Sequence, residues 1–286
     1  MNVYDIDKKE FKKLKPFITS YISTEAQMFI FDKHYKWSKE KNLFKKFYVT
    51  SGESFSNKLY TINNLLEFKE NCDINELVLP NSLISINHQI HGFSLPLIEN
   101  CSNFLEIQYS FDISLKNKLE ILRKYAEVLN KIHKYSDFYI GDIHEGNFLV
   151  NNTNNNINII DLDSCKIGNN SPFPSRYLNT NKIISSLPIK YQLHNNGLYI
   201  PNKNTDNFCL IIMLLNTISG INTNRLTIEE FYNYLAYLKD IGYPNELIKQ
   251  FGNIYTNEEN FLDNNLLDNI PNNYASLYKV FKYKKK

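Results

Sequence analysis

The sequence predicts an α+β fold with a β-rich first part, residues 1–99, and a mainly helical second part, residues 100–286. Aromatic and aliphatic residues alternate through 18–50, a pattern typical of strands. Apolar residues after position 114 recur with a helical period, and an Asn-rich turn at 151–156 joins two short apolar runs into a predicted hairpin. The chain of 286 residues is long enough for one large domain or two lobes with a sizeable core.

The first part is expected to place strands around one helix. The strands are predicted from short apolar or alternating runs bounded by turn residues, at 28–31, 43–49, 82–86 and 90–98. Residues 87–89 are expected to turn a hairpin between the last two strands. A helix is predicted for 61–71, because its apolar residues have helical spacing and Thr61 can cap its first turn.

The second part is predicted to contain capped helices. Ser114 precedes a stripe of apolar residues on one helix face, at 115, 119, 122, 126 and 129. Four prolines within 164–204 block long helices there, and Asp206–Ile218 then predicts a helix buried on nearly all sides. The sequence Thr227-x-x-Glu230 is a capping box at the start of a further helix.

Composition limits the partners and the compartment. Lys and Arg total 32 and Asp and Glu total 30, so the formal net charge of +2 gives no reason to expect a nucleic-acid partner. The longest apolar run, Phe208–Leu215, is far too short to span a bilayer, and the first residues lack the apolar segment of a signal peptide. The four cysteines show no C-x-x-C spacing, which indicates reduced thiols. We therefore expect a cytoplasmic protein with no membrane partner.

The most informative stretch of the chain is 139–163. Asp142 is followed five residues later by Asn147, and Asp161 comes fourteen residues after Asn147, at the end of the predicted hairpin. Phosphoryl transfer from ATP needs such a set, with one carboxylate to orient or deprotonate the attacking hydroxyl and an amide and a second carboxylate to hold magnesium. The alternative is a polar hairpin whose Asp and Asn residues only cap turns.

This D-x-x-x-x-N…D segment resembles the catalytic loop and metal-binding strand of the protein-kinase-like superfamily. The resemblance covers about residues 18–240 and implies a two-lobed fold with ATP and Mg²⁺ as cofactors. It implies that Asp142 is catalytic and that Asn147 and Asp161 bind the metal. Asp206, before an apolar helix, resembles the aspartate that in kinases holds the backbone of the catalytic loop.

Several positions depart from the kinase pattern. Asp163 stands where kinases have a glycine, and it is either a further metal ligand or a surface residue. Ile140 and Gly141 replace the His-Arg pair, which argues against control by a phosphate on the following segment. His144 replaces a lysine and either contacts the transferred phosphate or is simply packed. The sequence G-D-I-H-x-G-N is closer to the aminoglycoside-phosphotransferase, choline-kinase and other atypical branches.

The resemblance also implies a nucleotide site in the first part. A strand lysine should reach the α- and β-phosphates, and Lys45 fits that role better than Lys46. Its expected partner on the predicted helix is Glu67, which the spacing favours over Glu70, unless this side chain faces solvent. The adenine is expected against the connection between the two parts, at Leu97 and Ile98.

The resemblance implies two alternative functions. One is an ATP-dependent phosphotransferase, with a protein Ser/Thr or a small-molecule hydroxyl as the unidentified acceptor. The other is a pseudokinase, a nucleotide-binding or scaffolding module. The missing glycine-rich loop, whose place is taken by residues 23–26, favours the second alternative, whereas the intact Asp142, Asn147 and Asp161 favour the first.

Overall fold

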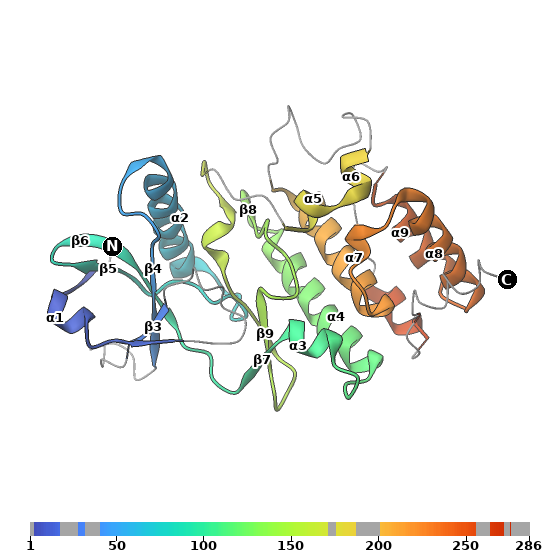
Figure 1. Ribbon diagram of the computed structural model, residues 1–286, viewed down its shortest axis with the longest axis horizontal. Helices are drawn as coiled ribbons and strands as arrows, with labels where there is room; N and C mark the ends of the chain where they lie inside the picture. The colour runs from blue at the N-terminus through green and yellow to red at the C-terminus, as the bar shows by residue number, and fades with distance from the viewer. Residues whose placement is uncertain are drawn as a thin grey trace.

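The computed structural model describes residues 3–17, 28–31, 41–170, 176–186, 201–255, 264–271 and 275. These residues form a mixed α+β structure, as predicted, with the large sheet toward one end and the C-terminal helices toward the other (Figure 1). No helix in the described part of the chain has both the length and the apolar character needed to cross a membrane.

The largest sheet has six strands: β1 (Val3–Ile6), β2 (Lys15–Pro16), β3 (Met28–Phe31), β4 (Asn42–Lys46), β5 (Ser82–Ile86) and β6 (Gln89–Pro96). Their order is β1-β5-β6-β4-β3-β2, and the β1–β5 pair is parallel while the other pairs are antiparallel. The predicted β5–β6 hairpin is confirmed. Asn87 and His88 turn it with φ of 49° and 66°, as a two-residue hairpin turn of the I′ type requires.

Both faces of this sheet are covered. On one face, Phe44 of β4 belongs to a small apolar cluster, against which Phe11 of the short helix α1 (Lys8–Phe11) packs. On the other face, Phe93 of β6 belongs to the main core. Side chains alternate along a strand, and Lys45 lies on the face of Phe93, with its ammonium 5.9 Å from the centre of that ring.

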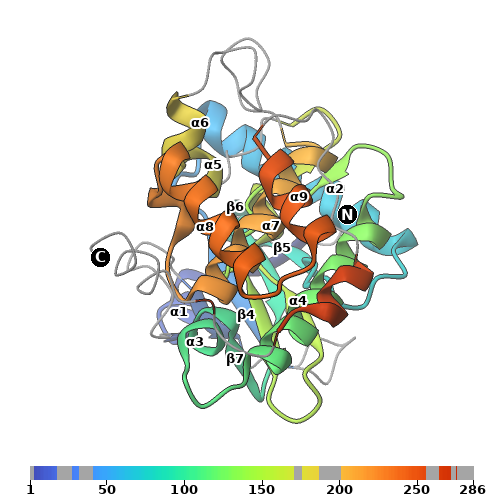
Figure 2. The same cartoon turned by 90° about the vertical axis from the view of Figure 1, so that its right-hand side faces the viewer.

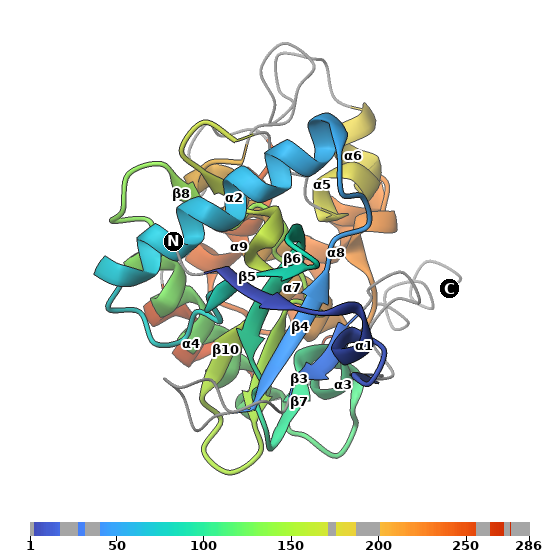
Figure 3. The same ribbon diagram turned by 90° about the vertical axis from the view of Figure 1, so that its left-hand side faces the viewer.

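Helix α2 (Gly52–Asn71) lies beside this second face (Figure 3) and is longer than predicted. It begins at Gly52, so the predicted cap at Thr61 is wrong. Thr61 is buried within the helix, where its hydroxyl donates to the carbonyl of Asn57 at 3.0 Å instead of capping a first turn. Phe55 and Leu59 extend the buried face of α2 through its first half.

After residues 97–100 the chain enters two small sheets. One consists of β7 (Cys101–Asn103), β9 (Phe148–Asn151) and β10 (Ile157–Ile159), and the other of β8 (Phe138–Tyr139) and β11 (Lys166–Ile167). The segment before β5 binds to the edge of β10, since the amide of Val78 donates to the carbonyl of Ile159 at 2.9 Å. This contact ties the first part of the chain to the β9–β10 hairpin.

The helices of the second part are α3 (Phe104–Tyr109), α4 (Leu115–Ile132), α5 (Arg176–Thr180), α6 (Lys182–Ser186), α7 (Lys203–Ser219), α8 (Ile228–Asp240) and α9 (Asn245–Asn253), with 3₁₀ turns η1 (Leu162–Ser164), η3 (Thr223–Arg225) and η4 (Asn264–Asn269). Helix α7 is buried along most of its length and lies amid α4, α8 and α9 (Figure 2). One apolar cluster extends from the large sheet through α2 and α4 to α7 and α9.

The helix starts that were predicted from capping residues are confirmed at two positions. The Ser114 hydroxyl accepts from the amide of Asn117 at 3.2 Å, and the predicted apolar stripe of α4 is buried. Thr227 and Glu230 form the predicted capping box of α8. Helix α7 starts before the predicted Asp206, because the side chain of Asn202 accepts from two first-turn amides.

Candidate active site

The β9–β10 hairpin brings Asn147 and Asp161 together. Ile159 of β10 lies opposite Phe148 of β9, and the amide of Ile160 donates to the carbonyl of Asn147 at 3.0 Å. Asp161, the next residue, has a left-handed backbone with φ of 64°, a conformation that Asp tolerates better than most residues. Fourteen residues of sequence are thus folded back so that Asn147 and Asp161, two of the predicted metal ligands, lie at the same end of the hairpin.

A buried carboxylate holds the loop that precedes Asp142. Asp206, at the start of α7, accepts from the amides of Ile140 at 3.0 Å and Gly141 at 2.8 Å, and also lies 3.1 Å from Nε2 of His133. This is the backbone contact expected from the resemblance. Gly141 has a φ of 74°, in the left-handed region that favours glycine.

Asn147 and His144 flank the predicted catalytic residue. The amide group of Asn147 donates to the backbone carbonyl of Asp142 at 2.9 Å and approaches its carboxylate at 3.4 Å. The imidazole of His144 accepts from the amide of Gly146 at 3.0 Å through Nδ1, and its Nε2 lies 3.8 Å from the Asp142 carboxylate. Asp142 therefore has an amide and an imidazole beside it, and its side chain is 24% exposed.

Lys45 joins the large sheet to this hairpin. Its ammonium forms ion pairs with Asp161 and, at 2.7 Å, with Asp163. The other carboxylate oxygen of Asp163 pairs with Lys58 of α2 at 3.0 Å. We call Lys45, Lys58, Asp161 and Asp163 the Lys–Asp cluster. Lys46 lies on the opposite face of the sheet, with its ammonium 5.8 Å from the ring centre of Phe11.

The two carboxyl groups of the Lys–Asp cluster differ in the direction of their pKa shifts and in exposure. Burial alone would raise the pKa of Asp163, but the positive charges of Lys45 and Lys58 outweigh it and hold that pKa below its usual value. For Asp161, the attraction of Lys45 lowers the pKa, but burial and repulsion by Asp163 together raise it above the usual value. The side chain of Asp161 is 39% exposed and that of Asp163 only 7%. Asp161 is therefore the carboxylate that an incoming cation can reach.

Burial also opposes the charge of Lys45, but the two aspartates more than compensate. Desolvation by itself would lower the pKa of the Lys45 ammonium, and the charges of Asp161 and Asp163 raise it above its usual value. Lys45 is thus a buried cation throughout the physiological pH range.

The predicted pair between Lys45 and Glu67 is replaced by other contacts. Glu67 is exposed on α2, and none of the ion pairs among the described residues includes it. The helix faces the cluster with Lys58 instead. Because the predicted helix began at position 61, sequence reasoning missed Lys58, although Lys58, Ile62 and Leu65 have the spacing of one helix face.

Leu97 and Ile98 lie in the connection between β6 and β7 and are half-buried. The side chain that reaches the neighbourhood of Asp161 from this region is Leu95, which lines a cavity of about 10 Å³ together with Ile62 and Phe93. That volume is about the size of one water molecule. Residues 23–26, predicted to replace the glycine-rich loop, lie outside the described part of the chain.

A second set of buried contacts was not predicted. Glu145, in the loop between Asp142 and Asn147, accepts a hydrogen bond from the hydroxyl of Tyr177 in α5. The amide of Asn216 in α7 donates to the same hydroxyl at 3.4 Å. Burial, followed by the charge of Glu145, raises the pKa of Tyr177 well above its usual value, so the hydroxyl stays a donor. These contacts fix the loop against α5 and α7.

The donor set of this site is compatible with magnesium bound together with phosphate. Among the described residues, no three His, Cys, Asp or Glu side chains gather closely enough to hold a metal by themselves. Mg²⁺ in phosphate-transfer sites usually takes one or two carboxylates and completes its shell with phosphate and water oxygens. Asp161 offers such a carboxylate. Asn147 uses its Nδ2 toward Asp142, so its Oδ1 is the atom suited to a cation.

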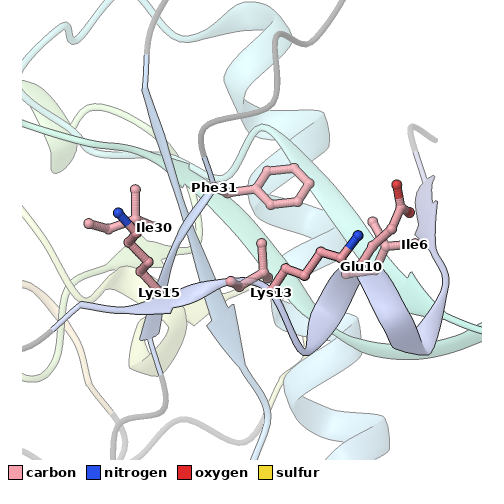
Figure 4. Close-up of a pocket in the computed structure, with 7 residues that line it drawn as sticks. Ile6, Glu10, Lys13, Lys15, Ile30 and Phe31 are labelled. Carbon is pink, nitrogen blue, oxygen red and sulfur yellow. The ribbon is translucent and has the colours of Figure 1, made fainter.

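A larger hollow lies on the face of the sheet that is turned away from Lys45. It has a volume of about 310 Å³ and is lined by Ile6, Glu10, Lys13, Leu14, Lys15, Ile30 and Phe31 (Figure 4). Its lining combines apolar side chains with two lysines and one glutamate. It brings together no carboxylate and amide set of the kind found at Asp142, so the candidate active site is the Asp142–Asp161 region.

The residues brought together here come from distant parts of the sequence. Lys45 and Asp161 are separated by 116 positions, and Lys58 and Asp163 by 105.

No known family model matches this chain, and neither does any of the curated proteins it was compared with.

Proposed function

We propose that this protein is an ATP-dependent phosphotransferase with a two-lobed, protein-kinase-like fold. The observation that carries the proposal is the ion pair between Lys45 and Asp161 at the end of the β9–β10 hairpin. At the same end of this hairpin, Asn147 is hydrogen-bonded to Asp142. A lysine, a metal-binding carboxylate, an amide and a separate carboxylate are the parts that phosphoryl transfer from ATP uses.

Each residue has a distinct role in the proposed reaction. Asp142 orients the acceptor hydroxyl and takes its proton, and His144 contacts the transferred phosphate. Lys45 binds the α- and β-phosphates. Asp161 and Asn147 hold Mg²⁺, which offsets the negative charge of the phosphates. The acceptor is a protein Ser/Thr side chain or a small-molecule hydroxyl.

Two observations support a second function, a pseudokinase. Lys45 is neutralised by two aspartates, and the cavity beside Asp161 has a volume of only about 10 Å³. A module whose Lys–Asp cluster only stabilises the fold would have this arrangement. Such a protein would act by binding partners and not by transferring phosphate.

Thermal unfolding with nucleotide tests metal binding at this site. A ligand that binds only the native state stabilises it by about 2.7 kcal/mol at 100 times its Kd. In the wild type, we expect ATP to raise Tm more with Mg²⁺ than with EDTA. In Asp161→Ala, we expect the rise in Tm to be the same with Mg²⁺ and with EDTA. Asp240→Ala, at the exposed end of α8, serves as the control. Equal shifts with and without Mg²⁺ in all three proteins would refute the proposed metal site.

Transfer of label from γ-labelled ATP then separates the two functions. The wild type is incubated with Mg²⁺, with and without cell lysate or small hydroxylated acceptors. Transferred label supports the phosphotransferase. Nucleotide binding without transfer to any tested acceptor supports the pseudokinase.

A further inference from the structure

Helix α2 contributes a lysine to the candidate active site. The ammonium of Lys58 donates to the carboxylate of Asp163 at 3.0 Å and to its backbone carbonyl at 2.7 Å. Lys45 donates to the other oxygen of the same carboxylate at 2.7 Å. Two ammonium groups, one from β4 and one from α2, are therefore held side by side on a single aspartate. The side chain of Lys58 is 21% exposed, so a ligand can reach it.

The charges of the Lys–Asp cluster explain why a second lysine is needed. With Lys45 alone, the carboxylates of Asp161 and Asp163 would give the cluster a net charge of −1, which repels a polyanion. Lys58 brings the net charge to zero. Once a cation binds to Asp161, the two lysines are the positive groups that face an incoming phosphate chain.

Contacts other than those of Lys58 also attach α2 to the rest of the molecule. The hydroxyl of Thr61 accepts from the amide of Asn170 at 2.9 Å, and the hydroxyl of Tyr60 accepts from the backbone of Asn169 at 3.4 Å. Ile62 and Leu65 of the same helix are buried in the main core. These contacts already hold α2 beside the segment that follows Asp161.

We propose that Lys58 is a second phosphate-binding residue, which Asp163 holds beside Lys45 so that the two ammonium groups together bind a chain of at least two phosphates. This inference rests on the proposed function for the identity of the nucleotide, and on the Lys–Asp cluster for the recognition of phosphate. Asp163 is then the positioning residue for both lysines, and Asp161 is the carboxylate that binds the metal.

The test measures binding of two probes by calorimetry, Mg·ATP and inorganic tripolyphosphate without metal. Lys58→Gln removes the charge but keeps a donor for Asp163, and Lys58→Arg keeps the charge. Lys69→Gln is the matched control, because Lys69 lies on the same helix but donates to the carbonyl of Pro80 and to Asn81. Circular dichroism and thermal unfolding check that each variant is folded.

A hydrogen bond to a charged group contributes about 1.5–3 kcal/mol, so we expect Lys58→Gln to lower the affinity for both probes about 10- to 100-fold. The affinity of Lys58→Arg for both probes should stay within a few fold of the wild-type affinity, and that of Lys69→Gln should equal it. None of the three substitutions should change the affinity for adenosine. Unchanged affinity of Lys58→Gln for both probes would overturn the inference and leave the proposed function standing.

The remaining outcomes separate the two proposals. Binding of tripolyphosphate that depends on Lys58, without binding of Mg·ATP, would support the phosphate site and refute the proposed function. A wild-type protein that binds neither probe would refute both. If Lys58→Gln does not fold, equal binding by Lys58→Arg and the wild type supports a charge-based role, whereas loss of binding in a folded Lys58→Arg overturns it.

Discussion

The carboxylate of Asp142 lies between an amide and an imidazole, and both come from its own loop. Asn147 approaches it at 3.4 Å and His144 at 3.8 Å, while Asp206 holds the preceding backbone from α7. Backbone contacts and Asn147 therefore help to set the position of Asp142. We expect the loop to keep its shape when the charge of Asp142 is removed.

We expect Asp142→Asn to fold normally and to bind Mg·ATP with nearly unchanged affinity, because the substitution keeps the shape of the side chain. Transfer of label should fall by about 10²–10⁴-fold, the usual contribution of a positioned general base. Both quantities are measured in the same preparation, with Asp240→Asn as the control. Undiminished transfer by Asp142→Asn would exclude this residue from the proposed mechanism.

Lys118 of α4 is a buried cation outside the candidate active site. Its ammonium donates to the carbonyls of Gln108 at 2.8 Å and Ser110 at 2.7 Å, near the end of α3. Burial lowers the pKa of Lys118 from its usual 10.5 to about 8. Between these two values the unfolded chain binds more protons than the native protein, so the stability rises with pH.

Relative to Lys118→Gln, we expect the free energy of unfolding of the wild type to rise by roughly 1 kcal/mol per pH unit between about pH 8 and pH 10. Urea unfolding at a series of pH values measures it. Burial raises the pKa of Tyr125 and Tyr234 above the usual value, so their effect has the opposite sign and begins above that window. Parallel stability curves for the two proteins would show that Lys118 does not titrate in this range.

At the level of the elements, the backbone of β4 beside Lys45 occupies the space that a side chain at position 92 of β6 would need. Gly92 of β6 lies opposite Lys46, and a Cβ at position 92 would lie 2.1 Å from the backbone carbonyl of Lys45. A side chain there would have to displace the strand that carries Lys45. The absence of a side chain at Gly92 thus helps to set the position of the lysine.

We expect Gly92→Ala to reduce the free energy of unfolding by about 1–3 kcal/mol, the usual cost of overpacking, and to weaken the binding of Mg·ATP. Gly252→Ala is the matched control. Its Cβ would lie 3.6 Å from the side chain of Leu235, an ordinary contact, and alanine is favoured over glycine in a helix by about 1 kcal/mol. An unchanged free energy of unfolding in Gly92→Ala would mean that β4 and β6 can move apart without loss of stability.

At the scale of the whole molecule, the described residues share one main apolar core. It includes Phe93 of the large sheet, Leu65 of α2, Leu122 of α4 and Leu214 of α7. The contact between Val78 and Ile159 and the Lys–Asp cluster also join the two parts of the chain. A boundary near residue 99 therefore separates two regions of secondary structure that are joined by a common core.

We expect the protein to unfold in a single cooperative transition, because neither part keeps a complete core when the other unfolds. Calorimetry and circular dichroism should give coincident midpoints, and the calorimetric and van't Hoff enthalpies should agree. Disruption of the large sheet by Gly92→Ala should lower the midpoint for both parts together. Two resolved transitions would show that the two parts are thermodynamically independent.

Local interactions are what the sequence by itself determined. The cap at Ser114, the capping box at Thr227 and the spacing of Asp142, Asn147 and Asp161 involve residues that are close in the chain or joined by one hairpin. Such features follow from helical period, turn residues and strand pairing, all of which can be read along the sequence. For the same reason Thr61 was misassigned, since a threonine that donates to its own helix looks the same in sequence as one that caps it.

The composition of the Lys–Asp cluster was decided only by the tertiary structure. Lys58 meets Asp163 across 105 positions, and neither residue shows a local pattern that indicates the other. Their meeting depends on the start of α2 at Gly52, on the packing of that helix against the sheet, and on the turn of Asp161 after β10. Each of these is a consequence of burying apolar surface, which selects a face of an element but does not specify the charged residue at its edge.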